Sequence, residues 1–281
     1  MKSPTCIGIV YNPQSPATLD MAKELETRLD FPGHMWKSSA GNLGDVQEFL
    51  GQTDLIVVAG GDGTILRLVR EIASYNIPMV GINMGRVGFM AELSVHDCVE
   101  RLPEYIYGNL RLESRMMLEA KVIGSGESEP RFTLHALNDV VVGRGGIARL
   151  LDIETTIDGV PLTSYRADAV IVSTATGSTG YALSAGGPIL YPETVAMLIQ
   201  PVAAHTGLSN GLILPDYSLI ELSASKDHEA VLSVDGFSDM NLDAGDIVQI
   251  KRSPYTTKFL RAHAPGTFYA ALTRRLGLES G

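Results

Sequence analysis

The chain has 281 residues, 45% of them hydrophobic and 19% charged, and a formal net charge of −10 at pH 7. This length exceeds the usual size of one hydrophobic core and predicts two domains, and an acidic chain without a basic tract is not expected to bind nucleic acid. With two cysteines, no signal-peptide pattern and no apolar stretch near the roughly 18 residues of a membrane helix, we expect a soluble protein without a membrane partner in the reducing cytoplasm.

The first hundred residues alternate between short apolar runs and segments with helical spacing. The apolar runs at 6–11, 55–59 and 79–82 predict strands, whereas hydrophobic residues recur at helical spacing around 22–29 and 65–72. Alternating strands and helices form parallel sheets covered by helices, and ligands bind outside the carboxyl ends of such strands. We therefore predict an α/β N-terminal domain with a parallel sheet.

From about Arg111 the pattern changes to short strands separated by turns, which predicts an all-β C-terminal domain. Asp158-Gly159 and Asp235-Gly236 are the clearest turn signals. Helical spacing returns near the C-terminus, in a helix expected to pack back on the N-terminal domain. We assign the α/β domain to residues 1–108 with 255–281, and the β-rich domain to 109–254. The expected strands of the β-rich domain are 117–123, 132–142, 150–157, 170–173, 219–224, 231–234 and 247–250.

The strand at 55–59 leads directly into Gly60-Gly61-Asp62-Gly63-Thr64, and a helical pattern follows. Glycines at a strand-to-helix turn let the backbone approach a ligand, and the amides at the helix N-terminus favour anionic oxygens. This pattern predicts a phosphate site. Because a carboxylate repels phosphate, Asp62 must bind a metal, accept a proton or bond a hydroxyl. The alternative is a glycine-rich turn in which Asp62 only caps the helix.

A second candidate site combines a segment of small residues with an Asn-Asp pair. Residues 174–188 follow the strand at 170–173 and are rich in Gly, Ser and Thr, which suits a polyol or phosphate ligand, although an ordinary loop has a similar composition. Asn138 and Asp139 offer donors and acceptors to an adenine or a ribose, and they are equally able to begin an Asx-turn.

Three other patterns narrow the choice of chemistry. Residues 143–148 match a relaxed dinucleotide fingerprint, but a strand pattern follows where the fingerprint requires a helix, which disfavours a nicotinamide dehydrogenase. Residues 182–186 are one residue away from the hydrolase elbow G-x-S-x-G, yet they follow a loop rather than a strand. The chain has no Walker A sequence, so a kinase must hold phosphate through backbone amides and a metal.

Taken together, these motifs resemble those of the bacterial and archaeal NAD kinases along nearly the whole chain. The family's Gly-Gly-Asp-Gly-Thr motif corresponds to residues 60–64, its Asn-Asp or Asn-Glu pair resembles Asn138-Asp139, and its long glycine-rich motif resembles residues 176–188. The first motif also occurs in lipid kinases and phosphofructokinases, whereas the combination is far more specific. The family's α/β domain followed by a β-rich domain agrees with the division expected from periodicity.

The resemblance implies transfer of a phosphoryl group from ATP, or another donor, to the 2′-hydroxyl of the adenosine ribose of NAD. It also implies a homodimer or homotetramer, and Mg²⁺ bound through the donor phosphates rather than by protein ligands. Asp62 would be catalytic and accept or orient the hydroxyl proton. The residues implied to bind the substrates are Asp62, Gly63, Thr64, Asn138, Asp139, Arg149, Arg166, Asp168, Thr176, Gly177, Ser178, Thr179, Gly180 and Tyr181.

The sequence departs from the family pattern at three positions. Gly180 stands where alanine is commoner, Ala175 where proline is frequent, and Phe237 where a polar residue is common, which leaves the Phe237 contact open. Two rival functions remain: a lipid or sugar kinase built on the same glycine-rich turn, and a noncatalytic dinucleotide-binding regulator. The hydroxyl-rich segment at 176–181 disfavours an apolar lipid groove, and the presence of Asp62 favours an enzyme.

Overall fold

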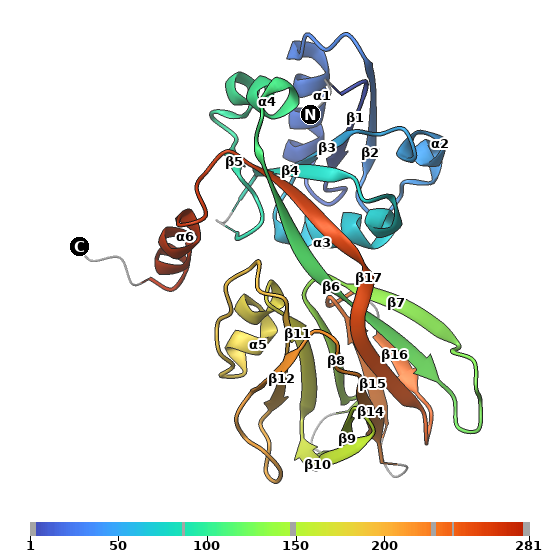
Figure 1. Cartoon of the computed structure of the whole chain (residues 1–281). Coiled ribbons are helices and arrows are strands. Elements are labelled where there is room, and N and C mark those ends of the chain that lie inside the picture. Colours follow the sequence, from blue (N-terminus) through green and yellow to red (C-terminus); the bar gives the residue numbers. More distant parts are fainter. Residues whose placement is uncertain (1–3, 86–87, 147–149, 226–228, 238, 278–281) are drawn as a thin grey trace. The chain divides into compact units, whose positions relative to one another are not determined.

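The computed structural model describes residues 4–85, 88–146, 150–225, 229–237 and 239–277 (Figure 1). The chain divides into two compact units: residues 1–114 together with 257–281, and residues 115–256. Two long strands, β6 (Arg111–Ile123) and β17 (Ile247–Arg261), carry the chain from one unit to the other. The C-terminal segment thus belongs to the same unit as the N-terminus.

The first unit is an α/β domain with a parallel sheet. Its elements are β1 (Cys6–Tyr11), α1 (Pro16–Arg28), β2 (His34–Ser39), the 3₁₀ turn η1 (Gly44–Val46), α2 (Gln47–Leu50), β3 (Leu55–Ala59), α3 (Asp62–Ile72), η2 (Ala73–Tyr75), β4 (Pro78–Asn83), β5 (Leu93–Ser94), α4 (Cys98–Tyr107) and α6 (Thr267–Arg275). The strands lie in the order β5-β4-β3-β1-β2, each parallel to its neighbour, and the end of β17 also pairs with β4.

Hydrophobic periodicity explains which residues of this domain form strands and helices and which of their faces are buried. Every residue of β3 is buried, as expected of a parallel strand with both faces covered. On α1 the buried residues Thr18, Met21, Ala22 and Leu25 recur at helical spacing, and side chains from β1, β3, β4, α1 and α4 form one core. This core fixes β3, and therefore fixes the point at which the turn to α3 begins.

The second unit is all β apart from one short helical stretch. Its elements, besides β6 and β17, are β7 (Phe132–Ala136), β8 (Asp139–Arg144), β9 (Leu151–Ile157), β10 (Val160–Ala167), β11 (Ala169–Thr174), η3 (Gly177–Thr179), α5 (Tyr181–Ser184), β12 (Ala196–Val202), β13 (Leu212–Pro215), β14 (Ile220–Ala224), β15 (Ala230–Val234) and β16 (Asp239–Leu242). One antiparallel sheet has the order β13-β12-β11-β8-β15-β16, and a second antiparallel run is β10-β9-β14-β17.

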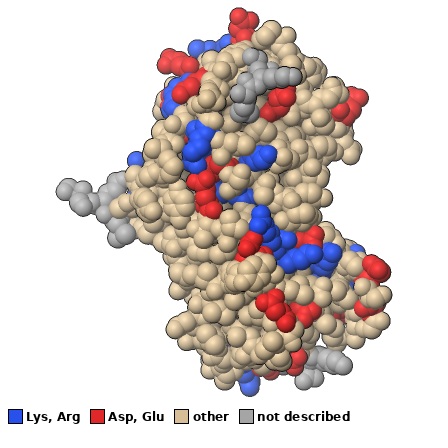
Figure 2. All heavy atoms as spheres, in the orientation of Figure 1, with Lys and Arg blue, Asp and Glu red and all other residues tan. Residues whose placement is uncertain are grey.

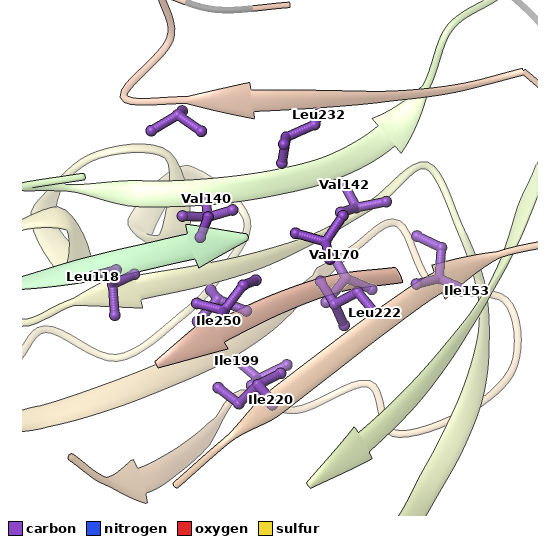
Figure 3. Packing of buried hydrophobic residues seen from close by; sticks show 14 of the residues in the cluster. Leu118, Val140, Val142, Ile153, Val170, Ile199, Ile220, Leu222, Leu232 and Ile250 are labelled. Carbon is purple, nitrogen blue, oxygen red and sulfur yellow. The ribbon is translucent and has the colours of Figure 1, made fainter. Parts of the chain in front are cut away.

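The core of the second unit draws side chains from both sheets. Val140 and Val170 come from the first sheet, and Ile153 and Leu222 from the second, and they lie in one cluster (Figure 3). β11 is buried at every position, because Ile171 packs on its other face against a second cluster that includes Ala175 and Ala182. The segment after β11 therefore covers the outer face of its own strand.

The predicted fold class is confirmed, with a parallel α/β domain followed by an all-β domain. The C-terminal helix α6 contacts the N-terminal domain, since the rings of Phe268 and Phe89 lie 5.8 Å apart. Both Asp-Gly turns form, with φ of +52° at Asp158 and Asp235. The single strand predicted at 132–142 is wrong: β7 ends at Ala136 and β8 begins at Asp139.

Charged side chains of opposite sign lie beside one another on the face drawn in Figure 2. Exposed ion pairs of the described residues include Arg28 with Glu24 at 2.7 Å and Arg131 with Glu127 at 2.8 Å. Such exposed pairs contribute little to stability. In the described part of the chain, none of the helices has the length and hydropathy required to cross a bilayer.

Candidate functional site

Residues 60–64 join the end of β3 to the start of α3. Gly61 is the N-cap residue and Asp62 is the first residue of the helix. The amide of Thr64 donates to the carbonyl oxygen of Gly61 at 2.9 Å, which closes the first turn. Since the N-terminus of a helix carries a partial positive charge, the carboxylate of Asp62 is stabilised there, as an anionic ligand would be.

The carboxylate of Asp62 lies against the loop at residues 88–90. Its Oδ2 accepts a hydrogen bond from the Phe89 amide at 3.0 Å, and its Oδ1 accepts one from the Met90 amide at 3.2 Å. Gly88 makes this contact possible, because a Cβ atom at Gly88 would lie 2.1 Å from Oδ1. Two backbone donors fix the direction of the carboxylate, and the Asp62 side chain is still 23% exposed.

A buried ion-pair cluster centred on Arg261 supports this loop. The Arg261 guanidinium donates to the Met90 carbonyl at 2.8 Å and pairs with Glu113 at 2.9 Å and Glu92 at 3.1 Å. The three charged side chains are only 6–7% exposed, so each depends on the others for compensation of its charge. The loop that holds Asp62 is thereby attached to the end of β17.

In the second unit, Asp235 holds the corner between β7 and β8. Its carboxylate accepts hydrogen bonds from the amides of Leu137 at 2.8 Å, Asn138 at 2.7 Å and Asp139 at 3.0 Å. These bonds interrupt the strand that the sequence predicts at 132–142. The Oδ1 atom of Asn138 is buried and has no hydrogen-bond partner among the described residues, so it does not close an Asx-turn and can accept from a ligand.

Asp139 is 7% exposed and lies close to Asp235. Burial raises the pKa of the Asp139 carboxyl from 3.8 to about 7, and the charge of Asp235 adds to this increase. Near neutral pH the Asp139 carboxyl therefore exists in both protonation states. It can donate a hydrogen bond as well as accept one.

Hydrogen bonds within the segment after β11 determine its shape. Ser178 donates its hydroxyl to the Ala175 carbonyl at 2.7 Å, and Thr179 donates to the Thr176 carbonyl at 3.1 Å. The Thr176 hydroxyl accepts from Arg115 at 3.1 Å. These buried hydroxyls serve the fold of the loop, whereas the Tyr181 side chain is 46% exposed.

The Asn138 corner and this segment lie together. The Thr174 amide donates to the Asn138 carbonyl at 2.9 Å, and the Thr174 hydroxyl donates to the Leu137 carbonyl at 2.6 Å. A Cβ atom at Gly177 would lie 2.1 Å from the Asn138 carbonyl oxygen, so glycine permits this approach. A Cβ atom at Gly180 would lie 3.2 Å from the carbonyl oxygen of Gly177. The backbone of the glycine-rich segment is therefore held against Asn138.

Two of the remaining predicted site residues, Arg166 and Asp168, lie at the end of β10 and directly after it. Asp168 pairs with Arg144 at 3.3 Å, and Arg166 is an exposed residue of β10 whose amide donates to the Thr206 carbonyl. Arg149 lies outside the described residues. Phe237 donates its amide to the Val234 carbonyl at 3.1 Å in the turn after β15.

Sequence analysis missed three groups of residues that shape these sites. The loop at 88–90 and Arg261 carried no motif, and Asp235 was interpreted only as a turn residue. Within the described ranges, no group of three His, Cys, Asp or Glu residues could hold a metal ion. The fingerprint at 143–148 precedes β9 instead of a helix, in agreement with its rejection.

Comparisons with known proteins agree on one family. Residues 33–110 match the ATP-NAD kinase N-terminal domain, and residues 137–262 match the ATP-NAD kinase C-terminal domain. The chain is 39% identical to an NAD kinase of Dehalococcoides mccartyi over 271 residues, covering 96% of this chain and 95% of the relative. It is 35% identical to an NAD kinase of Chloroflexus aggregans over 96% of this chain and 98% of that protein.

Two solved structures have the same fold. Yeast NADH kinase, crystallised with NADH, superposes with a TM-score of 0.85 at 25% identity and covers 100% of this chain and 90% of that chain. An NAD kinase from Archaeoglobus fulgidus in complex with ATP superposes with a TM-score of 0.78 at 26% identity, over 95% of this chain and 98% of that chain.

Proposed function

The chain belongs to the NAD kinase family, and we propose how its residues carry out the reaction of that family. As an NAD kinase it is a phosphotransferase that moves a phosphoryl group from ATP, or another donor, to the 2′-hydroxyl of the adenosine ribose of NAD. The new bond joins the ribose oxygen to phosphorus, and the bond that breaks joins phosphorus to the leaving oxygen of the donor. The hydroxyl proton must go to a base.

Asp62 is the base in this proposal. The observation that carries it is a carboxylate at the N-terminus of α3 that two backbone amides hold in one direction. Uptake of the hydroxyl proton by a positioned carboxylate typically contributes about 10²–10⁴-fold to the rate. A carboxylate that only capped the helix would bond amides of its own first turn, whereas the Asp62 carboxylate accepts from amides of the loop at 88–90.

Gly63 and Thr64 line the donor phosphates in this proposal. They lie in the first turn of α3, where the helix dipole favours anions; because the Thr64 amide already donates to the Gly61 carbonyl at 2.9 Å, the Gly63 amide is the one that binds phosphate. Bound through the donor phosphates, Mg²⁺ supplies neutralisation of their charge.

Asn138, Asp139 and the segment 176–181 bind the NAD in this proposal. The buried Oδ1 atom of Asn138, which has no hydrogen-bond partner among the described residues, suits an adenine amine or a ribose hydroxyl, and Asp139 can donate or accept near neutral pH. Since the hydroxyls of Ser178 and Thr179 bond within the loop, this segment offers its backbone groups and the exposed Tyr181 ring. Arg149, Arg166 and Asp168 complete the set that the family resemblance implies.

Assembly and location are also proposals. We expect a cytoplasmic homodimer or homotetramer, as the family resemblance implies. β10 and β13 each stand at the end of a strand order, and edge strands of this kind can pair with a second copy. Sedimentation of the purified chain tests the assembly, and a monomer at micromolar concentration would refute it.

A coupled assay tests the function. The purified chain is incubated with ATP, Mg²⁺ and NAD, and NADP is measured with an NADP-specific dehydrogenase. We expect NADP from the parent chain and a loss of about 10²-fold or more in kcat for Asp62→Asn. Absence of NADP from the folded parent chain would refute the proposed reaction, whereas an undiminished Asp62→Asn enzyme would refute only the role of Asp62.

A further inference from the structure

Helix α6 brings an arginine to the Asp62 carboxylate. Nη1 of Arg275, in the last turn of the helix, lies 3.8 Å from Oδ2 of Asp62. The same guanidinium lies over the ring of Phe89, 4.5 Å from the ring centroid, and Phe268 of α6 contacts that ring as well. One residue of the loop at 88–90 therefore holds both charged groups: the Phe89 amide binds Asp62, and the Phe89 ring binds Arg275.

The Arg275–Asp62 contact is weak enough to be exchanged. At 3.8 Å it is longer than a hydrogen bond, and the two side chains are 42% and 23% exposed. Partly exposed ion pairs contribute little to stability, so separating this pair costs little. A guanidinium that binds two phosphate oxygens makes two charge-assisted hydrogen bonds instead of one long contact.

The proposed reaction needs a positive group at this place. Negative charge spreads over the oxygens of a phosphoryl group during transfer, and kinases stabilise that charge with cationic side chains as well as metal. This acidic chain has no Walker A lysine. The ring of Phe89 keeps the guanidinium of Arg275 beside Asp62, where the acceptor hydroxyl and the transferred group would have to meet.

We propose that Arg275 binds the transferred phosphoryl group and that, before the substrates bind, its guanidinium pairs with the Asp62 carboxylate. Binding of the donor phosphates exchanges the Asp62 contact for phosphate oxygens and leaves the Asp62 carboxylate to accept the ribose proton. This inference rests on the proposed function of residues 60–64. Arg275 stays cationic throughout and exchanges no proton.

The test compares Arg275→Met and Arg275→Lys with Arg274→Met, a matched control that removes the neighbouring arginine of the same helix turn. Steady-state kinetics are measured for ATP and NAD separately, with urea unfolding of each variant. We expect Arg275→Met to lower kcat/KM for ATP by about 10³-fold or more and leave KM for NAD within about twofold, because a positioned arginine contributes about 10³–10⁵-fold. Arg275→Lys should recover part of the loss, and Arg274→Met should remain within about threefold of the parent.

The outcomes separate this inference from the function on which it rests. A parent chain that makes no NADP refutes the function, whatever the variants do. An active parent with an equally active Arg275→Met variant refutes the role of Arg275 alone. Equal losses for ATP and NAD, together with a lowered urea midpoint, would assign Arg275 to the packing of α6 and also refute the inference.

Discussion

The burial of Asp139 makes the stability of this protein depend on pH in an unusual direction. In the folded chain the pKa of the Asp139 carboxyl is raised from 3.8 to about 7, first by burial and then by the charge of Asp235. Between these two values the folded chain binds a proton that the unfolded chain does not bind. The Asp139 contribution to the free energy of unfolding is therefore highest at acidic pH and is lost as the pH rises through 7.

The size of this effect follows from the shift. Each pKa unit corresponds to about 1.4 kcal/mol, so a shift from 3.8 to about 7 amounts to about 4 kcal/mol in total. About 2–3 kcal/mol of that falls between pH 5 and pH 8, a range in which the protein can be handled. Asp139→Asn removes the titration and has nearly the shape of the protonated side chain.

Urea unfolding at pH 5, 6, 7 and 8 measures this contribution. Relative to Asp139→Asn, the parent chain should lose about 2–3 kcal/mol of unfolding free energy between pH 5 and pH 8. Asp20→Asn, which removes a carboxylate with a 75% exposed side chain, is the control and should follow the parent. Parallel pH profiles for the parent and Asp139→Asn would show that Asp139 is ionised in the folded chain and would refute the reasoning.

Three further substitutions test the contacts that hold the two sites. Gly88→Ala should lower kcat by about 10²-fold, because the added methyl group displaces Asp62; a normal kcat in the coupled assay would contradict this. Arg261→Met leaves two buried carboxylates without compensation and should lower the free energy of unfolding by about 3–5 kcal/mol in urea, with a smaller loss for Arg261→Lys; equal losses would count against the ion pairs. Asp235→Asn removes one acceptor for backbone amides and should cost about 1–3 kcal/mol, and by loosening the Asn138 corner it should raise KM for NAD while KM for ATP stays unchanged.

The local pattern of hydrophobic and polar residues was sufficient to predict the two fold classes and their order. The change from alternating strands and helices to consecutive strands placed the two fold classes in the right order, because side-chain periodicity is a property of neighbouring residues. The same holds for the turn at Asp62, since a strand, a glycine-rich turn and a helix follow one another directly. The Asp-Gly turns were found for a similar reason: they require positive φ within a few residues.

Contacts between residues far apart in sequence could not be found in this way. Asp235 bonds the Asn138 amide across 97 residues, and Arg261 bonds the Met90 carbonyl across 171 residues. The corner at Asn138 was predicted as continuous strand, because its backbone donors bond a carboxylate supplied by a distant turn. Arg275 had no motif at all, and only the packing of α6 reveals its contact with Asp62.

Sequence patterns were enough to predict the fold class, the glycine-rich turn at Asp62 and the family resemblance, because each depends on residues within one or two neighbouring elements. The folded structure was needed to see how Asp62 and Asn138 are held, which hydroxyls after β11 are used by the fold, and why Asp139 is buried near another carboxylate. Hydrogen bonding, burial and charge act across space, and the chain brings these partners together only when it folds.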